Sequence, residues 1–576
     1  MSQAAELDVL GCPLQGAALI EASAGTGKTW NICALYLRLL LERELGVRQI
    51  LVVTFTNAAT AELRERIRAR IGDTLGFLRA AGPAAADPFV PALVAAIEQR
   101  GIAQERMEQL LDQALQAFDE AAIFTIHGFC QRALAETPFA AGLPFASTLE
   151  PDDDALLQEA VNDFWRREIG GGTLAPELAA YLLERKDTPQ TLARLLRRQL
   201  AKPTARCLWP EPAADDDIGA AAERIGQLFE AARALWQAEA DAIRALLNAA
   251  LPDFTSKVTA DKIAAACDAC DQFFAAERPA QLPNGLRGVA MKLLRQSELA
   301  AQLKKNRPPP AHPFFGQIET LLAELPALQQ RQDEVLQHAR LRLLRALLEQ
   351  AAPALRQRKR ELRTLAYDDL LYNVHEALAG GRFPWLAATL RERYPAALID
   401  EFQDTDPLQF GVFDAIYGDS DAPLFLVGDP KQAIYSFRNA DLHTYLQAKR
   451  RAGAIHTLAA NQRSSAGLIA GLNALFSANP VAFMLDGLDY QQVRCGAKPR
   501  TEFVDRSGEA RADLQLWMLP AADDELLLRG AARRAAIDAC AAEIARLLAA
   551  AQRGEVMLDG RPRQPGDIAV LVRNHA

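Results

Sequence analysis

Residues 17–29 read AALIEASAGTGKT and decide the fold. The apolar run predicts a short buried strand, the glycine-rich turn a tight loop, and the helical spacing after it a helix. A phosphate-binding loop requires this setting, because backbone N–H groups converge there and the helix N-terminus attracts negative charge. The residues expected to form this nucleotide-binding loop are Ala22, Ser23, Ala24, Gly25, Thr26, Gly27, Lys28 and Thr29.

The last two residues of this loop have specific expected roles. Lys28 would reach the outer phosphates of the nucleotide, and the Thr29 hydroxyl would ligate Mg²⁺. One position departs from the GxxxxGK[ST] pattern, because Ala22 stands where the first glycine is expected. A glycine-rich turn without function is the alternative, which the strand–turn–helix setting disfavours.

A second stretch, LIDEFQDTDPLQ (398–409), crowds four carboxylates into seven positions after an apolar run. Like charges at a strand end need a cation, and a bound divalent ion can supply the largest local charge. We expect Asp400 to bind the Mg²⁺ of the nucleotide and Glu401 to orient or deprotonate the attacking water. For Asp404 and Asp406 the structural interpretation is favoured, in which they cap or begin the next helix.

Strand and helix signals alternate in the first 150 residues and return near residue 397, which predicts an α/β fold with a parallel sheet. Residues between these parts are rich in Ala, Leu and Arg with helical spacing. The expected domains are a first motor domain at 1–150 and 365–452, an all-helical insertion at 151–364, and a third section at 453–576. Further strands are expected at 513–519 and 567–574.

The net charge of −9 over 576 residues excludes a wholly basic nucleic-acid coat but leaves room for local basic strips. One such strip, LRQRKRELR (355–363), is either a solvated helix face or a contact for duplex DNA phosphates. No apolar run approaches the ~20 residues that span a bilayer, and the N-terminus lacks a secretory signal. These features point to the cytoplasm.

Eight cysteines are scattered along the chain, and Cys267 and Cys270 form a lone CxxC. A structural zinc site would need a second pair at matching spacing, and the sequence has none. The favoured interpretation is two positions on one Ala-rich helix.

Six segments in order carry a family resemblance: EASAGTGKT, TFTNAATAELRERI, FTIHGFC, LIDEFQDTDPLQ, LVGDPKQAIYSFRNAD and LAANQRSS. They resemble the ordered motifs of the UvrD/Rep-like superfamily 1 DNA helicases. The first segment and the long helical insertion are most similar to the RecB branch, the beta subunits of exodeoxyribonuclease V. The resemblance runs from about residue 14 to the end of the chain. It implies a P-loop (RecA-like) motor domain and an incomplete second one.

The resemblance assigns further nucleotide contacts residue by residue. It implies that Gln15 recognises adenine, although an ordinary loop glutamine would look the same. It implies that Gln432 senses the γ-phosphate and that Arg463 contacts it, with a surface residue at a helix start as the alternative for Arg463. Gln462 stands where the family usually has an aromatic that stacks on adenine, so nucleotide affinity or base selectivity should be weaker.

The resemblance also implies a track for single-stranded DNA. Phe55 and His127 match residues that line the DNA channel, and Tyr435 and Phe437 match a region where bases stack. Stacking suits a motor because every base has a π-face, so the grip does not depend on sequence. Core packing is the alternative for each of the four.

The implied function is that of an ATP-dependent 3′–5′ DNA helicase or translocase subunit in double-strand-break repair and recombination. ATP and Mg²⁺ would be its cofactors, with single-stranded DNA, duplex ends and RecC-like and RecD-like subunits as partners. A free-standing UvrD/Rep-type repair helicase and a non-hydrolysing ATP- and DNA-binding fragment are the alternatives. The family's later motifs and a nuclease domain should lie beyond Ala576. We therefore expect an N-terminal portion of a longer protein, weak or inactive alone.

Overall fold

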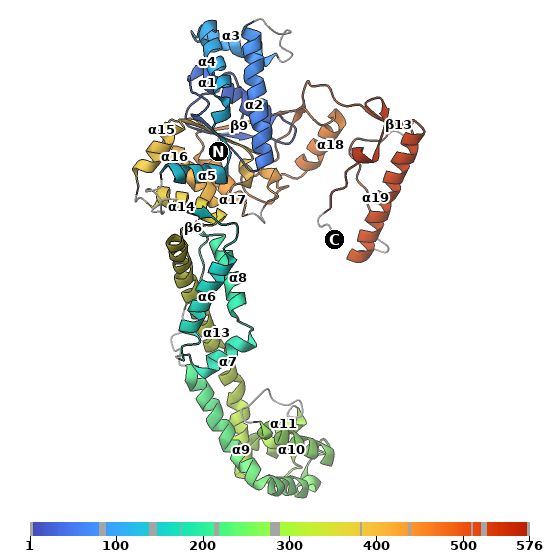
Figure 1. The fold of residues 1–576 in the computed structure, drawn as a ribbon. Helices are drawn as coiled ribbons and strands as arrows, with labels where there is room; N and C mark the ends of the chain where they lie inside the picture. The colour runs from blue at the N-terminus through green and yellow to red at the C-terminus, as the bar shows by residue number, and fades with distance from the viewer. Residues whose placement is uncertain are drawn as a thin grey trace. The chain divides into compact units, whose positions relative to one another are not determined.

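The computed structural model describes residues 4–79, 88–137, 147–172, 174–211, 218–276, 288–380, 383–435, 439–508, 511–519 and 527–572. It divides into two compact units (Figure 1). Unit 1 comprises residues 1–149 and 365–576, and unit 2 comprises residues 150–364.

A seven-stranded sheet forms the centre of unit 1, in the order β1-β9-β2-β8-β7-β3-β4, and its strand pairs are parallel. The strands are β1 (Ala5–Glu6), β2 (Ala17–Glu21), β3 (Ile50–Thr54), β4 (Ile123–Thr125), β7 (Ala396–Ile399), β8 (Leu424–Gly428) and β9 (Ala454–Thr457). The inner strands are short apolar runs buried on both faces, as a parallel sheet requires. The predicted α/β class is confirmed.

Helices cover both faces of this sheet, because alternate residues of β3 belong to different apolar cores. Ile50 and Val52 pack into one core, and Leu51 and Val53 into the other. The first core includes α1 (Lys28–Glu42), α2 (Asn57–Leu78), α3 (Phe89–Gln99) and α4 (Gln104–Gln116). The second includes α5 (Ile126–Glu136), α14 (Tyr367–Ala379), α15 (Trp385–Arg393), α16 (Pro407–Tyr417) and α17 (Leu442–Arg451).

The sheet reaches beyond residue 452, where we expected the first motor domain to end. Strand β9 pairs with β2 over four residues, from Ala18 with Ala454 to Glu21 with Thr457. The expected boundary is corrected accordingly, because residues that complete a strand ladder belong to the sheet they complete.

The rest of unit 1 forms small elements: β10 (Ala460–Asn461), α18 (Ala466–Ser477), β11 (Arg494–Cys495), β12 (Phe503–Asp505), α19 (Arg529–Gln552), β13 (Val556–Leu558) and β14 (Arg561–Pro562). The strands expected at 513–519 and 567–574 are wrong for their described residues, 513–519 and 567–572. A strand needs a neighbour for its backbone groups, and among the described residues these segments pair with no strand. Trp517 and Leu571 are exposed.

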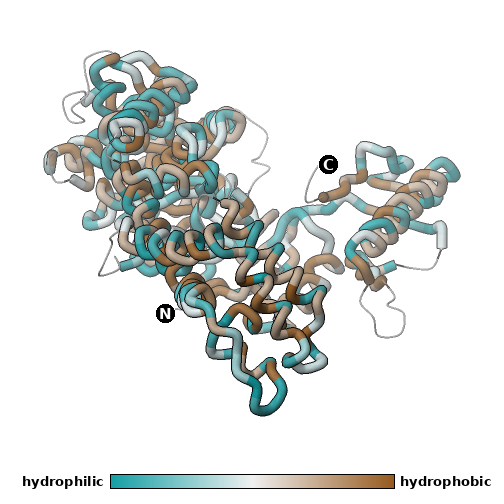
Figure 2. The backbone as a smooth tube through the Cα atoms, turned by 90° about the horizontal axis from the view of Figure 1, so that it is seen from below, coloured by the Kyte–Doolittle hydropathy of each residue, from teal (hydrophilic) through white to brown (hydrophobic). Residues whose placement is uncertain are grey.

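Unit 2 is helical apart from an isolated bridge and a short strand at its end, within the residues that the structure describes. Its helices are α6 (Asp154–Glu168), α7 (Pro176–Glu184), α8 (Pro189–Leu200), α9 (Ile218–Ala249), α10 (Ala260–Ala275), α11 (Val289–Leu294), α12 (Gln296–Leu299) and α13 (Pro313–Leu362). Hydrophobic and hydrophilic residues are mixed along the chain in Figure 2, and apolar residues of α9, α10 and α13 pack into one core of unit 2. None of the described helices is long and apolar enough to cross a membrane.

The CxxC and the basic strip at 355–363 both lie on helices of unit 2. Cys267 and Cys270 are buried free thiols on α10, which agrees with the helical interpretation of the CxxC. In the basic strip, Arg358 and Arg360 are exposed, whereas Lys359 is buried and pairs with Asp153 at 2.5 Å. The strip is therefore only partly a solvated face.

Candidate active site

The loop between β2 and α1 depends on two glycines in the left-handed region. Gly25 has φ +80°, and Gly27, which caps α1, has φ +89°. A Cβ atom on Gly25 would lie 2.7 Å from the Cβ atom of Arg463, closer than real Cβ contacts allow. Both positions therefore require glycine, for backbone conformation and, at Gly25, for space as well.

A second segment, 461–463, holds the loop from outside. The Asn461 side-chain amide donates to the Ala24 carbonyl at 3.0 Å, and the Gln462 backbone N–H donates to the Gly25 carbonyl at 2.7 Å. Arg463 is exposed, and its guanidinium has no hydrogen-bond or ion-pair partner among the described residues. The structure thus brings Arg463 to the loop, and it adds Asn461, which we did not identify from the sequence.

The side chain of Gln462 contacts protein groups, whereas the aromatic side chain usual at this position in the family stacks on adenine. Its Oε1 accepts from the backbone N–H of Lys498 at 3.1 Å, and its amide packs against Gly496. No ring is therefore offered to an adenine at this position.

Lys28 forms an ion pair with Glu401, with 2.6 Å between Nζ and Oε2. The Lys28 side chain is 14% exposed and the Glu401 side chain 35% exposed. Glu401 adopts φ +50° and ψ +43°, a left-handed conformation that is uncommon for a residue with a side chain. Strain of this kind persists where surrounding structure fixes it, often at functional sites.

Asp400 directly follows the last residue of β7. Its N–H donates to the Val53 carbonyl at 2.9 Å, and its Oδ1 accepts from the Glu401 N–H at 2.9 Å. Burial, and then the charge of Glu401, raises the pKa of Asp400 to about 6. The carboxylate of Asp400 and the hydroxyl of Thr29 are hard oxygen donors of the type Mg²⁺ prefers, and a cation there would offset the desolvated charge.

Asp406 and Asp404 behave differently. Asp406 caps α16, since its Oδ1 accepts from the Gln409 N–H at 2.8 Å, and Pro407 follows in the first turn as expected. Asp404 is no cap, and this expectation is wrong. It ends the 3-10 turn Phe402–Asp404, is 5% exposed, and its Oδ1 has no hydrogen-bond partner among the described residues. Burial, together with the charge of Glu401, raises its pKa to about 6.

Gln432 lies in the 3-10 turn Pro430–Gln432 after β8. Its Nε2 donates to Asp429 Oδ2 at 2.7 Å, and Lys431 Nζ pairs with Asp429 Oδ1 at 2.8 Å. Gln403 links this turn to Glu401, with Nε2 2.6 Å from Glu401 Oε2 and Oε1 accepting from the Asp429 N–H at 2.9 Å. We did not identify Gln403 or Asp429 from the sequence, although both lie inside the quoted motifs.

The structure does not bring Gln15 to this site. Gln15 precedes β2, whereas the phosphate-binding loop follows it, and Gly16 bonds to Asp421 and Leu424 at the start of β8. Five strand residues span roughly 16 Å. Gln15 therefore lies at the amino edge of the sheet, and the adenine contact expected of it stays a prediction.

Four rings of unit 1, at Phe55, His127, Tyr367 and Tyr435, form two pairs. The Phe55 and Tyr435 rings are 5.4 Å apart, and the His127 and Tyr367 rings are 6.2 Å apart. Phe55 follows β3 and His127 follows β4, which pair with each other. None of the four belongs to the two apolar cores of the sheet among the described residues, which favours a surface role over core packing. Phe437 lies outside the described residues.

Tyr367 was missed from the sequence. It begins α14 and is 50% exposed, and its ring contacts His127 edge-on. Burial lowers the pKa of His127, so the imidazole is neutral at pH 7 and offers an uncharged ring. The available signal was an aromatic just before two acidic residues at a helix start, which is too common to single out.

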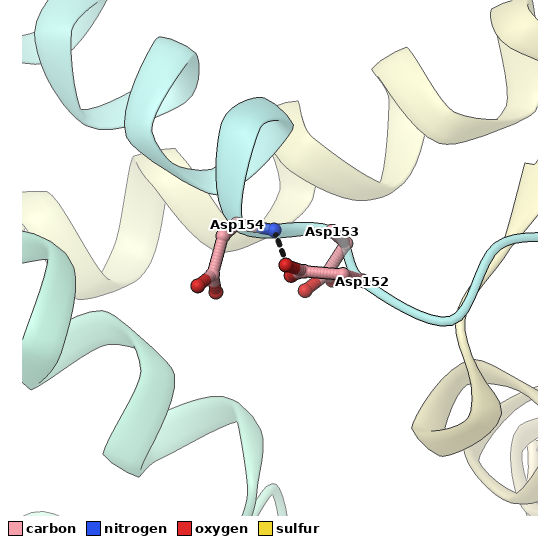
Figure 3. A group of neighbouring side chains, drawn as sticks. All are labelled: Asp152, Asp153 and Asp154. Carbon is pink, nitrogen blue, oxygen red and sulfur yellow. Dashed lines mark hydrogen bonds between the residues drawn. The ribbon is translucent and has the colours of Figure 1, made fainter.

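Unit 2 contains a separate acidic cluster, Asp152, Asp153 and Asp154, whose ligand atoms lie within 4.8 Å of one another (Figure 3). The Asp154 N–H donates to Asp152 Oδ1 at 2.8 Å. Asp153 pairs with Lys359 and Asp154 with Arg197, so the protein itself supplies the cations. This cluster gives no indication of a metal site.

Comparison with known proteins agrees with this geometry. The family model for the UvrD/REP helicase N-terminal domain matches residues 3–453. The chain is similar to RecBCD enzyme subunit RecB of Escherichia coli, with 36% identity over 595 positions covering 100% of this chain and 48% of the relative. RecB of Haemophilus influenzae is 32% identical over 86% of this chain and 42% of the relative. RecB of Mycobacterium tuberculosis is 27% identical over 97% of this chain and 38% of the relative. The chain spans about half the length of these curated relatives or less.

Proposed function

Because the chain belongs to the UvrD/REP helicase family, we propose that it is the ATP-hydrolysing motor portion of a RecBCD-type helicase subunit. The observation that carries the proposal is the convergence of the glycine loop, Lys28, Glu401 and Arg463 at the carboxyl edge of one parallel sheet. Ligands of open α/β sheets bind at this edge. The domains we propose are a motor domain in unit 1, a helical insertion in unit 2 and the start of a second motor domain after β9.

Nucleotide binding would begin with an exchange of partners at Lys28. Its ammonium pairs with Glu401 at 2.6 Å, and the phosphates of ATP offer it more negative charge. Arg463, exposed beside Gly25, and Gln432 would contact the γ-phosphate. Asp400 and Thr29 would hold Mg²⁺, which when bound neutralises part of the phosphate charge.

Hydrolysis would then depend on Glu401. Once Lys28 turns to the phosphates, the Glu401 carboxylate is free to orient the attacking water and to accept its proton. General-base catalysis of this kind contributes about 10²–10⁴ in rate. The strained backbone of Glu401 fixes where the carboxylate points.

The DNA track we propose runs along the paired rings Phe55–Tyr435 and His127–Tyr367, with Phe437 added from the family resemblance. Single-stranded DNA would stack there without sequence preference. Translocation 3′ to 5′, entry from duplex ends and assembly with RecC-like and RecD-like subunits complete the proposal. The assembly with such subunits is supported by the RecB relatives, whose name makes them subunits of RecBCD, whereas the polarity and the duplex ends come from the family resemblance. Such an enzyme would work in the cytoplasm, where the chromosome lies.

Tyr367→Ala tests the DNA track, because each stacked base is worth roughly 1–3 kcal/mol. We expect weaker binding of a fluorescent oligonucleotide by that amount, equally for mixed base sequences and with an unchanged salt slope. Trp385→Ala is the matched control, since Trp385 is 48% exposed and contacts Phe383 instead. Equal DNA affinity in wild type and Tyr367→Ala would contradict the track.

Steady-state ATPase activity with and without single-stranded DNA separates the helicase motor from a non-hydrolysing clamp. Stimulated turnover supports the motor, and ATP binding without turnover supports the clamp. A free-standing UvrD/Rep-type repair helicase would be active without a RecC-like subunit, which co-purification would test.

A further inference from the structure

We infer that Gln403 is a positioning residue that joins the water-activating Glu401 to the γ-phosphate contact Gln432. The inference rests on the proposed ATPase function and deepens it. Gln403 is 2% exposed and lies between the two catalytic segments, one after β7 and one after β8. It would not touch ATP, and it would act by holding residues that do.

The donor end of Gln403 holds the Glu401 carboxylate. Gln403 Nε2 and Lys28 Nζ both donate to the same oxygen, Glu401 Oε2, each at 2.6 Å. When Lys28 turns to the phosphates of ATP, Gln403 is the side-chain donor that remains on that carboxylate among the described residues. The other oxygen, Oε1, is left to face the water.

The acceptor end of Gln403 holds the segment after β8. Its Oε1 accepts from the Asp429 N–H at 2.9 Å. This approach depends on Gly428, because a Cβ atom there would lie 2.6 Å from Gln403 Oε1. A backbone N–H can only donate, so the orientation of the Gln403 amide is fixed, with its NH₂ toward Glu401.

Asp429 continues the connection to the γ-phosphate contact. It is 3% exposed, and Gln432 Nε2 donates to its Oδ2 at 2.7 Å. The result is an unbroken series of hydrogen bonds from Glu401 through Gln403 and Asp429 to Gln432. If Gln432 moves when it contacts the γ-phosphate, these hydrogen bonds would shift the Glu401 carboxylate as well. Glu401 would then take up its position for activating water only when ATP is bound.

Two substitutions take the series apart. Gln403→Glu keeps an acceptor for the Asp429 N–H but loses the donor to Glu401, and Gln403→Met loses both. Misplaced catalytic groups cost about 10- to 100-fold in rate, and we expect a loss of that size in kcat for both variants. The KM for ATP and the affinity for a fluorescent ATP analogue should change less than about threefold, because Lys28 and the loop are untouched.

The matched control is Gln409→Met, since Gln409 is also buried, at 9% exposed, but lies on α16 outside the series. It should keep the wild-type kcat. Thermal unfolding of all variants gives their stability independently of activity. A folded Gln403→Met variant with the kcat of Gln409→Met would overturn the inference, and so would equal losses in kcat and in analogue affinity. A wild-type chain that neither binds nor hydrolyses ATP would instead contradict the proposed function.

Discussion

The chain has two dense acidic stretches, and they differ in what balances their charge. The stretch at 400–406 in unit 1 follows a buried strand, and Asp400, Asp404 and Asp406 all have a pKa raised to about 6 by burial. The stretch at 152–154 in unit 2 forms the start of α6, where Lys359 and Arg197 pair with it.

Two lysines in ion pairs, Lys359 (buried) and Lys28 (half-buried), show the same difference. Lys359 lies within α13, well away from a helix start, and pairs with Asp153. Lys28 begins α1 behind two left-handed glycines, and its partner Glu401 has a second donor in Gln403. A carboxylate–lysine pair therefore indicates a functional role where a ligand could offer the lysine another partner, as at Lys28. It indicates a structural role where no such ligand site adjoins the lysine.

Glu401→Gln should show the largest effect. We expect kcat for ATP hydrolysis to fall about 10²–10⁴-fold, because a neutral amide cannot accept the proton of water. Affinity for ATP should hold or rise, since Lys28 no longer has a charged competitor. Asp152→Asn in the other acidic stretch should leave kcat unchanged. If Glu401→Gln hydrolysed ATP at the wild-type rate, the stretch at 400–406 would be no more catalytic than the stretch at 152–154.

Lys28→Ala and Lys359→Met should separate binding from stability. Charge-assisted hydrogen bonds are worth about 1.5–3 kcal/mol each, so Lys28→Ala should weaken ATP binding by about 100-fold in titration calorimetry. Lys359→Met should bind ATP normally, but among the described residues Asp153 then keeps only the longer pair with Arg197, at 3.8 Å, and unit 2 should be destabilised by about 1–3 kcal/mol. If Lys359→Met weakened ATP binding and Lys28→Ala only lowered stability, the roles of Lys28 and Lys359 would be exchanged.

Asp400→Asn should change the metal dependence of binding. We expect the ratio of ATP affinities with and without Mg²⁺ to fall about tenfold, because a neutral amide replaces a carboxylate ligand. Asp154→Asn, in the cluster that Lys359 and Arg197 balance, should leave that ratio unchanged. An unaltered ratio in Asp400→Asn would place the metal elsewhere.

Asp406→Asn should have the smallest effect, on stability alone. The folded pKa of about 6 lies above the unfolded value of ~3.9, so the folded wild type binds the proton more tightly and loses stability as pH rises from 4 to 6. Asn caps a helix as well as Asp. The variant should therefore equal wild type at pH 4 and exceed it by on the order of 1–2 kcal/mol at pH 8. A gain at pH 4 instead would reverse the sign of the argument.

Local chemistry made part of the site predictable. The glycine loop and Lys28 follow from a strand, a turn and a helix that are adjacent in the sequence. Glu401 follows from the carboxylates after a second strand, because parallel strand ends meet at one edge. Gln403 could not be identified, because its role depends on Asp429 in another segment. Tyr367 needed the contact with His127, 240 positions away in the sequence.

The errors have physical reasons of the same kind. Asp404 lies close to a helix start, yet a 3-10 turn places it inside instead. The segments expected as strands at 513–519 and 567–574 have apolar alternation without a pairing partner among the described residues. A sequence pattern shows which structures a segment could form, and the contacts it makes with other segments decide which one it does form.

The pairing of β2 has a consequence for how the protein is made. Its neighbours are β8 and β9, with Ala17 beside Leu424 and Ala18 beside Ala454. At about 5–20 residues per second, a ribosome needs roughly 20–80 s to supply the first of these partners after β2 emerges. Unit 2 is continuous in sequence and can fold in that interval, whereas the apolar β2 must wait unpaired. Nascent chains of this protein should therefore bind chaperones through their first 150 residues, and unit 1 should refold more slowly than unit 2.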